Sequence, residues 1–401
     1  MPALADPLCP ASSRADAALR DRLASVTDRL VAGLDDDLLA IVLGGSLARG
    51  QGMVLGGDDG PRVLSDIDLY VVRRRPRPER EGRLRAELVS FLESDGLVLA
   101  PLDLAFVAPD YFASLGSALP ARQLALGTRT LHEGPGTWAR PESVGRPDDP
   151  VDPDDAPRPL LTRMADALLQ SDAPEDWFTA VHRAKRWIDA PLAWVAAHGH
   201  YHPDRGRQLD RLEELTSDWT GAERAWRDRG ISVARDWLET IATRELDPPT
   251  LRLWPATSEE PDRAVRAWVW PFARAMFRTA GRAPGAAADV LAASARRGLD
   301  LAEDVPIVDD WLRRRPWPVR LRTARRWHPL APVAIPPWWR YASGGAGHER
   351  VYAAAALLYA GHEDWTHPLH DILPDDRALR RDGAAALGRL WADWILGGGR
   401  R

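Results

Sequence analysis

The fold is decided by IVLGGSLARG (residues 41–50) together with VLSDIDLYVV (residues 63–72). The apolar run Leu38 to Leu43 predicts a buried strand, and the Gly-Gly-Ser sequence at residues 44–46 predicts a tight turn that opens a short helix. The second stretch predicts another strand, so the region has the order strand, turn, helix, loop, strand.

Two acidic residues, Asp66 and Asp68, lie one residue apart on the second predicted strand. Because side chains alternate along a strand, both carboxylates point to the same face. Carboxylate oxygens are the ligands that Mg²⁺ prefers. The turn at residues 44–46 offers backbone N–H groups and the positive end of a helix dipole, which favour a phosphate. Together these features predict a site for a metal-bound triphosphate.

The flanking segments predict helices and polar turns. After a leader that we expect to be disordered up to Ser13, apolar residues at helical spacing predict a helix from Ala15 to Leu34. The acidic run Asp35–Asp37 predicts a solvated turn. A second helix is predicted over Glu79–Ser94. The arginine-rich run at residues 73–78 predicts a solvated strand end at the edge of the site, where steering of an anionic ligand is the alternative role.

A third apolar strand, predicted over Leu97–Val107, contains one carboxylate, Asp103. An isolated carboxylate in a buried strand is unfavourable unless it is paired or bound to a metal. We therefore expect Asp103 to join Asp66 and Asp68 on adjacent strands of a small α/β sheet. A short last strand is predicted over Gly127–Leu131.

The 401 residues predict two or three domains. We expect an α/β domain over residues 1–140, an acidic proline-rich linker over 141–159 and a large, mainly α-helical domain over 160–401, which divides into two sub-bundles near 245–262. The helices predicted in this last part cover Leu160–Gln170, Pro174–His198, Arg205–Thr216, Gly221–Arg244, Pro261–Ala280, Gly285–Leu301, Gly347–Tyr359 and Arg377–Ile395. The tryptophans on these helices, among the 18 in the chain, are expected to be core anchors.

Composition narrows the class of protein. The net charge of −5 and the pI of about 6.1 give no overall field that would attract nucleic acid or an anionic membrane. The single cysteine, Cys9, excludes an internal disulfide framework and suits a reducing cytosol. No stretch is long and apolar enough for a membrane span, so we expect a cytoplasmic protein with no membrane partner.

Three separated motifs resemble those of the DNA polymerase beta-type nucleotidyltransferase superfamily: Gly45-Ser46-x-x-x-Gly50, Ser65-Asp66-Ile67-Asp68-Leu69 and Leu102-Asp103-Leu104. The helical remainder is similar in layout to aminoglycoside nucleotidyltransferases. The resemblance implies that Gly45, Ser46 and Ser65 bind the nucleotide. It also implies that Asp66, Asp68 and Asp103 hold two Mg²⁺ ions, and that Asp103 lies nearest the acceptor and accepts its proton.

The activity implied by the resemblance is transfer of a nucleoside monophosphate, AMP above all, from an NTP to a hydroxyl of a small-molecule acceptor, with release of pyrophosphate. One alternative is a nucleotidyltransferase that modifies a macromolecule such as tRNA or protein, or that makes a nucleotide signal. The overall charge counts against nucleic acid as a partner. A second alternative is a catalytically inactive relative that binds nucleotides. The sequence does not indicate the acceptor, the base or the oligomeric state.

Two features lie outside the three motifs. The spacing between Ser46 and Asp66 is longer than is usual in the superfamily, and the extra segment Gln51–Val63 predicts a flexible flap over the nucleotide. Lys185 is the only lysine in the chain, which hints at a site that needs a compact ammonium group. The resemblance implies a contact between Lys185, alone or with Arg186, and the γ-phosphate.

Overall fold

A computed structural model describes residues 6–143, except 95, 101 and 116–118, and residues 177–254, with isolated residues at 151, 156, 159–160, 263–265 and 268–269. The chain divides into two compact units. The first comprises Met1–Asp152, Gly199–Asp210 and Ala234–Leu251, and the second comprises Pro153–His198, Arg211–Val233 and Arg252–Arg401. The sequence predicts one contiguous α/β domain over residues 1–140, whereas the first unit also includes two later segments.

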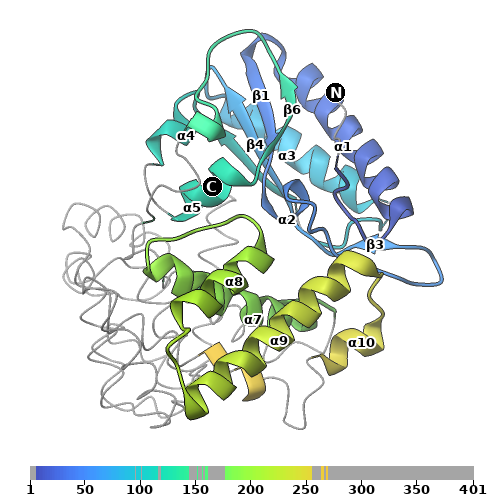
Figure 1. Ribbon diagram of the computed structural model, residues 1–401. Helices are drawn as coiled ribbons and strands as arrows, with labels where there is room; N and C mark the ends of the chain where they lie inside the picture. The colour runs from blue at the N-terminus through green and yellow to red at the C-terminus, as the bar shows by residue number, and fades with distance from the viewer. Residues whose placement is uncertain are drawn as a thin grey trace, which may run out of the picture. The chain divides into compact units, whose positions relative to one another are not determined.

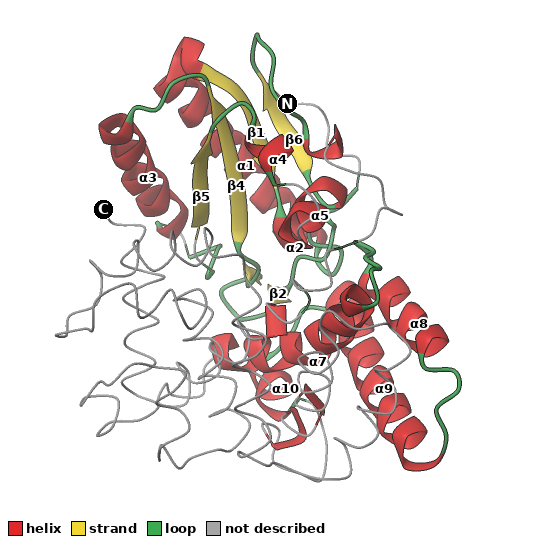
Figure 2. Cartoon of the chain, turned by 90° about the vertical axis from the view of Figure 1, so that its left-hand side faces the viewer, coloured by secondary structure: helices red, strands yellow, loops and turns green. Residues whose placement is uncertain are grey.

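The first unit is built on a four-stranded mixed sheet in the order β5-β4-β1-β6 (Figures 1 and 2). Strand β1 is antiparallel to both of its neighbours, and β4 is parallel to β5. The small sheet and its predicted strands are confirmed with changed bounds: the second strand begins at Ile67, the third begins at Leu102 instead of Leu97, and the last is displaced by two residues toward the C-terminus. The strands are β1 (Leu38–Leu43), β4 (Ile67–Arg73), β5 (Leu102–Val107) and β6 (Arg129–Glu133).

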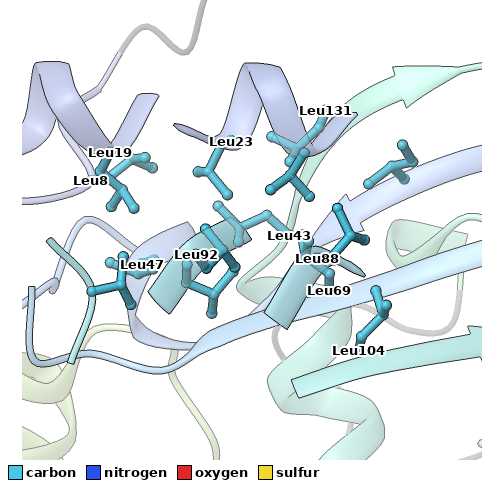
Figure 3. Close-up of a cluster of buried hydrophobic side chains, with 14 of the residues drawn as sticks. Leu8, Leu19, Leu23, Leu43, Leu47, Leu69, Leu88, Leu92, Leu104 and Leu131 are labelled. Atoms are coloured by element: carbon cyan, nitrogen blue, oxygen red, sulfur yellow. The ribbon is translucent and has the colours of Figure 1, made fainter. Parts of the chain in front are cut away.

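Two helices cover one face of this sheet, α1 (Ser13–Leu34) and α3 (Pro78–Glu93). The side chain of Ser12 caps α1 by accepting a hydrogen bond from the Ala15 amide, and Pro78 begins α3, where no amide hydrogen is needed. Leucines from both helices and from the strands form a continuous core between the layers (Figure 3). This packing confirms the predicted apolar stripe of each helix.

Within the described residues, the opposite face of the sheet is only partly covered. Two short helices, α4 (Tyr111–Ser114) and α5 (Leu119–Leu126), lie on this side (Figure 2), and a 3₁₀ turn follows at Pro141–Ser143. Phe112 is fully buried there against Val42, Val72 and Val107. The acidic residues of β4 and β5 lie on this same face, so the sheet positions them away from the main core.

The segment predicted to be a flexible flap is a two-stranded hairpin, β2 (Val54–Leu55) and β3 (Arg62–Val63). Backbone hydrogen bonds hold it on both sides: the amide of Leu246 donates to Val54 O at 2.7 Å, and the amide of Val63 donates to Leu97 O at 2.7 Å. The flap prediction is therefore wrong for the strands of the hairpin, because long-range partners fix them. Residues 57–59, at the tip, are exposed.

Three local predictions are also corrected. Leu8 and Cys9, expected in a disordered leader, are fully buried in the core beneath α1. Asp37, expected to be solvated, is buried and forms an ion pair with Arg77 at 2.6 Å. The arginine-rich run begins at Arg73, at the far end of β4, about 16 Å along the strand from Asp68. It therefore does not border the acidic residues, whereas the predicted exposure of the strand end is confirmed for residues 74–78.

Beyond residue 176 the described chain is mainly helical, and three of its helices were predicted, whereas the last one, α10, was not. The helices are α7 (Trp177–Ala197), α8 (Arg205–Leu215), α9 (Gly221–Thr243) and α10 (Pro248–Leu253). The predicted linker and the predicted helices at Leu160–Gln170, Pro261–Ala280, Gly285–Leu301, Gly347–Tyr359 and Arg377–Ile395 lie largely or wholly outside the described residues. None of the helices in the described ranges combines the length and apolar character that a membrane crossing requires.

Tryptophans form the core of the described part of the second unit. Trp187, Trp194 and Trp268 are almost completely buried, which confirms their predicted role as core anchors. Pro191 lies inside α7 and has no amide hydrogen for the carbonyl of Trp187, four residues earlier. The indole of Trp268 supplies that hydrogen bond, with Nε1 donating to Trp187 O at 3.1 Å. A tertiary contact thus replaces the helical hydrogen bond that Pro191 cannot donate.

Candidate active site

A glycine corner at the end of β1 forms one side of the candidate site. The amide of Gly44 donates to Asp68 O at 2.8 Å, so the corner is joined directly to β4. Gly45 has a backbone φ of +69°, and a Cβ atom there would lie 1.8 Å from Oδ2 of Asp68. Only glycine allows this conformation and this close approach. The corner leads into α2 (Gly45–Ala48), whose four residues give only a small helix dipole.

Three carboxylates lie on the partly covered face of the sheet. Asp68 and Asp103 are direct partners in the parallel pairing of β4 with β5, and Asp66 precedes Asp68 with the same side-chain direction. Ile67 and Leu69 alternate with them and are buried on the other face. The predicted placement on adjacent strands is confirmed for Asp68 and Asp103, whereas Asp66 lies just before the first residue of β4.

Asp103 is exposed, which corrects the expectation that it occupies a buried strand. In the described part of the sheet, β5 is the edge strand; Leu102, Leu104 and Phe106 turn toward the main core, and Asp103 turns toward the opposite face. The pKa of the Asp103 carboxyl is nevertheless raised by the protein atoms packed around it. The positive charge of Arg85 opposes this effect and the negative charge of Asp66 adds to it. The carboxyl therefore holds its proton more tightly than an ordinary aspartate does.

Two tyrosines adjoin the carboxylates. Tyr70 lies two residues beyond Asp68 on β4, and its ring stacks on that of Tyr111 with centroids 6.1 Å apart. Burial raises the pKa of Tyr70, and the charges of Asp68 and Asp103 raise it further. Burial and the charge of Asp103 also raise the pKa of Tyr111. Both phenols therefore stay neutral beside the acidic cluster, where they can donate hydrogen bonds.

The donor chemistry of the site suits a hard divalent cation, because carboxylates from two strands face the same side. Their spacing does not form a closed cage: in the described ranges, no group of three or more His, Cys, Asp or Glu side chains surrounds a common point as a metal ion would require. Magnesium is commonly held by one or two carboxylates, with substrate phosphates and water completing its shell. Asp66 and Asp68, which are two residues apart in the sequence, fit that mode of binding.

The two predicted serines differ in their surroundings. Ser46 lies in the first turn of α2 and is half-buried beside the glycine corner. Ser65 is fully buried, and its hydroxyl accepts a hydrogen bond from the amide of Met53 at 2.9 Å. This bond joins the segment before β4 to the segment before β2, so Ser65 has a structural role, and its contact with a nucleotide stays a prediction.

Lys185 belongs to the second unit, whereas the three aspartates belong to the first. It lies on α7, half-buried among neighbours that include the almost fully buried Arg183 and Arg186. Its contact with a nucleotide remains a prediction.

Sequence reasoning missed Tyr70, Tyr111 and Arg85 as neighbours of the acidic cluster. The alternation that places Asp66 and Asp68 on one face also places Tyr70 there, so this residue could have been found. Tyr111 and Arg85 come from a loop-linked helix and from α3, and no local pattern predicts that either reaches β5.

Comparisons with known proteins add a distant structural likeness. No protein-family model matches the sequence, and no curated protein matches it. Among solved structures, the chain is similar to a spectinomycin adenyltransferase from Enterococcus faecialis, determined with ATP and spectinomycin. The likeness has a TM-score of 0.28 at 12% identity and covers 55% of this chain and 99% of that chain.

Proposed function

We propose that this protein is a metal-dependent nucleotidyltransferase that moves a nucleoside monophosphate, with AMP as the first candidate, from an NTP to a hydroxyl of a small acceptor. The observation that carries the proposal is the contact between the glycine corner and the acidic face. Gly45 leaves no room for a side chain beside Asp68, while Asp66 and Asp103 flank Asp68 on the same face. A phosphate-binding turn and a set of carboxylates thereby share one location.

The roles of the residues follow from their order across the sheet. The backbone amides at Gly45 and Ser46, in the first turn of α2, have no helical acceptor and can donate to the triphosphate. Asp66 and Asp68 would hold magnesium together with that triphosphate, and magnesium would neutralise phosphate charge as pyrophosphate leaves. Asp103 lies on β5, and β4 separates this strand from β1, which leads into the glycine corner; this position suits a contact with the acceptor.

In the proposed reaction the acceptor oxygen attacks the α-phosphorus of the NTP, and the bond from that phosphorus to the bridging oxygen of pyrophosphate breaks. The hydroxyl proton passes to Asp103. A base works best when its pKa is not far below the working pH, and the protein atoms packed around Asp103 raise the pKa of its carboxyl in that direction. Pyrophosphate and the nucleotidylated acceptor are the products.

The experiment is an assay of pyrophosphate release with each of the four NTPs and Mg²⁺. The acceptor panel comprises hydroxylated small molecules, aminoglycosides and spectinomycin among them, and mass spectrometry detects the modified acceptor. We expect D68N to lower the rate by about 10³-fold, because several kcal/mol of charge stabilisation are lost. We expect D103N to lower it by about 10²–10⁴-fold through loss of the base.

The matched control is D58N, which removes an exposed carboxylate at the hairpin tip and should leave the rate unchanged. Circular dichroism should show that all three variants keep the wild-type fold. If D68N and D103N are as active as D58N, the acidic face is not the catalytic centre. If the wild-type protein binds Mg²⁺–ATP and releases no pyrophosphate with any acceptor, the inactive alternative replaces the proposal.

A further inference from the structure

Strand β5 is an edge strand whose outer backbone receives a side-chain donor from α3. In the described part of the sheet, β4 is its only neighbouring strand. Edge strands leave backbone groups without ladder partners. At Leu104 the carbonyl oxygen accepts a hydrogen bond from Nη2 of Arg85 at 2.7 Å. Arg85 thus stands where an additional strand would otherwise supply a donor.

Arg85 comes from the covered side of the sheet and reaches its edge. The preceding residue, Leu84, packs into the core together with Leu88 and Leu104. The guanidinium of Arg85 extends from this anchored turn of α3 to the backbone of β5, and its positive charge opposes the rise in the pKa of Asp103. One side chain therefore links the core, the strand edge and the acidic face.

The position of β5 decides on which face Asp103 lies. Because side chains alternate along a strand, a slip of one residue would turn Asp103 into the core and bring Leu104 to the acidic face. Repulsion among like charges at Asp66, Asp68 and Asp103 favours moving the edge strand away. A donor fixed at Leu104, one residue from Asp103, resists both movements.

We propose that Arg85 is a positioning residue that holds β5 at Leu104 and so keeps Asp103 opposite Asp68. The effect of Arg85 on turnover rests on the proposed function, whereas its effect on the strand does not. A guanidinium suits this position because its several N–H groups can serve the carbonyl oxygen while its charge faces the carboxylate.

The first test measures hydrogen exchange of the backbone amides of residues 102–107 in the full-length protein. We expect R85Q to speed exchange in this strand about 10-fold or more, since a charge-assisted hydrogen bond is lost. R85K can still donate to Leu104 O and should stay within about 3-fold of wild type. The control is R83Q, which removes an exposed arginine from the same helix and should leave exchange unchanged.

The second test compares kcat and KM for the nucleotide in the same variants. Misplacement of Asp103 should lower kcat of R85Q about 10- to 100-fold while KM for ATP stays within about 2-fold, and R85K should recover most of the loss.

Unchanged exchange in R85Q would overturn the role of Arg85 at the strand. Faster exchange with unchanged kcat would show that Arg85 only closes an edge, which also overturns the proposal. Absence of turnover in the wild-type protein would instead count against the proposed function, and the exchange test would still decide whether Arg85 holds β5.

Discussion

Gly45 affects both the backbone conformation of the glycine corner and the position of the Asp68 carboxylate. Its φ of +69° is unfavourable for residues with a side chain, and Oδ2 of Asp68 occupies the space that a Cβ would need. Gly96 has nearly the same conformation, with a φ of +66°, yet a Cβ there would meet nothing within 4 Å. Substitutions at Gly45 and Gly96 therefore distinguish the effect of backbone strain, which both would cause, from displacement of the Asp68 carboxylate, which only a substitution at Gly45 would cause.

We expect G45A and G96A each to lower the free energy of unfolding by about 1–2 kcal/mol, because alanine must adopt a left-handed conformation. Only G45A should also lower pyrophosphate release, by about 10²-fold or more, because its Cβ displaces Asp68. Urea denaturation and the release assay measure the two effects. Equal activity of G45A and G96A would show that the position of Asp68 does not matter for turnover.

The β2–β3 hairpin shows how an inserted element is fixed by its neighbours. Its two strands pair with each other over only two residue pairs, which is too little for independent stability. Leu246 and Val98 extend the pairing on either side of the hairpin. At the base of the hairpin, the hydroxyl of Ser65 accepts a hydrogen bond from the amide of Met53. The hairpin is therefore part of the first unit, and Ser65 is one of its anchors.

For this element we predict that S65A lowers the free energy of unfolding by about 1–3 kcal/mol, because a buried amide loses its acceptor. S90A changes an exposed position of α3 and should be neutral within about 0.5 kcal/mol. Denaturant titration gives both values. If Ser65 instead bound the nucleotide, KM for ATP would rise in S65A while stability stayed unchanged.

At the scale of the whole molecule, one helical glycine in each unit tests how tightly side chains pack around its helix. Gly82 on α3, in the first unit, is exposed, and a Cβ there would meet nothing within 4 Å, so its role is not steric. Gly230 on α9, in the second unit, faces Trp268, and a Cβ there would lie 2.1 Å from the indole ring. The same substitution should therefore act in opposite directions in the two units.

We expect G82A to raise the free energy of unfolding by up to about 1 kcal/mol through helix propensity. G230A gains the same propensity but overpacks the core by about 1–3 kcal/mol, and it also displaces the indole that donates to Trp187 O. A net loss of up to about 2 kcal/mol should result. Equilibrium denaturation of the two variants beside wild type tests the signs, and stabilisation by G230A would contradict this account of the tryptophan core.

Local patterns in the sequence determined the long helices α1 and α3, the strands β1 and β4, and the common direction of Asp66 and Asp68. The alternation of Asp66, Ile67, Asp68 and Leu69 is enough to place two carboxylates together, because side-chain direction in a strand has a period of two residues. The helical spacing of leucines in α1 and α3 likewise predicts the covered face of the sheet.

Only the tertiary structure decided which distant segments meet. The register that sets Asp103 opposite Asp68, the burial of Leu8 and Cys9, the pairing of the hairpin with Leu246 and the reach of Arg85 to Leu104 all join residues far apart in the chain. Such contacts depend on the order of strands and the paths of loops. Periodicity fixes the direction of a side chain within its own element and carries no information about the neighbour that it will find.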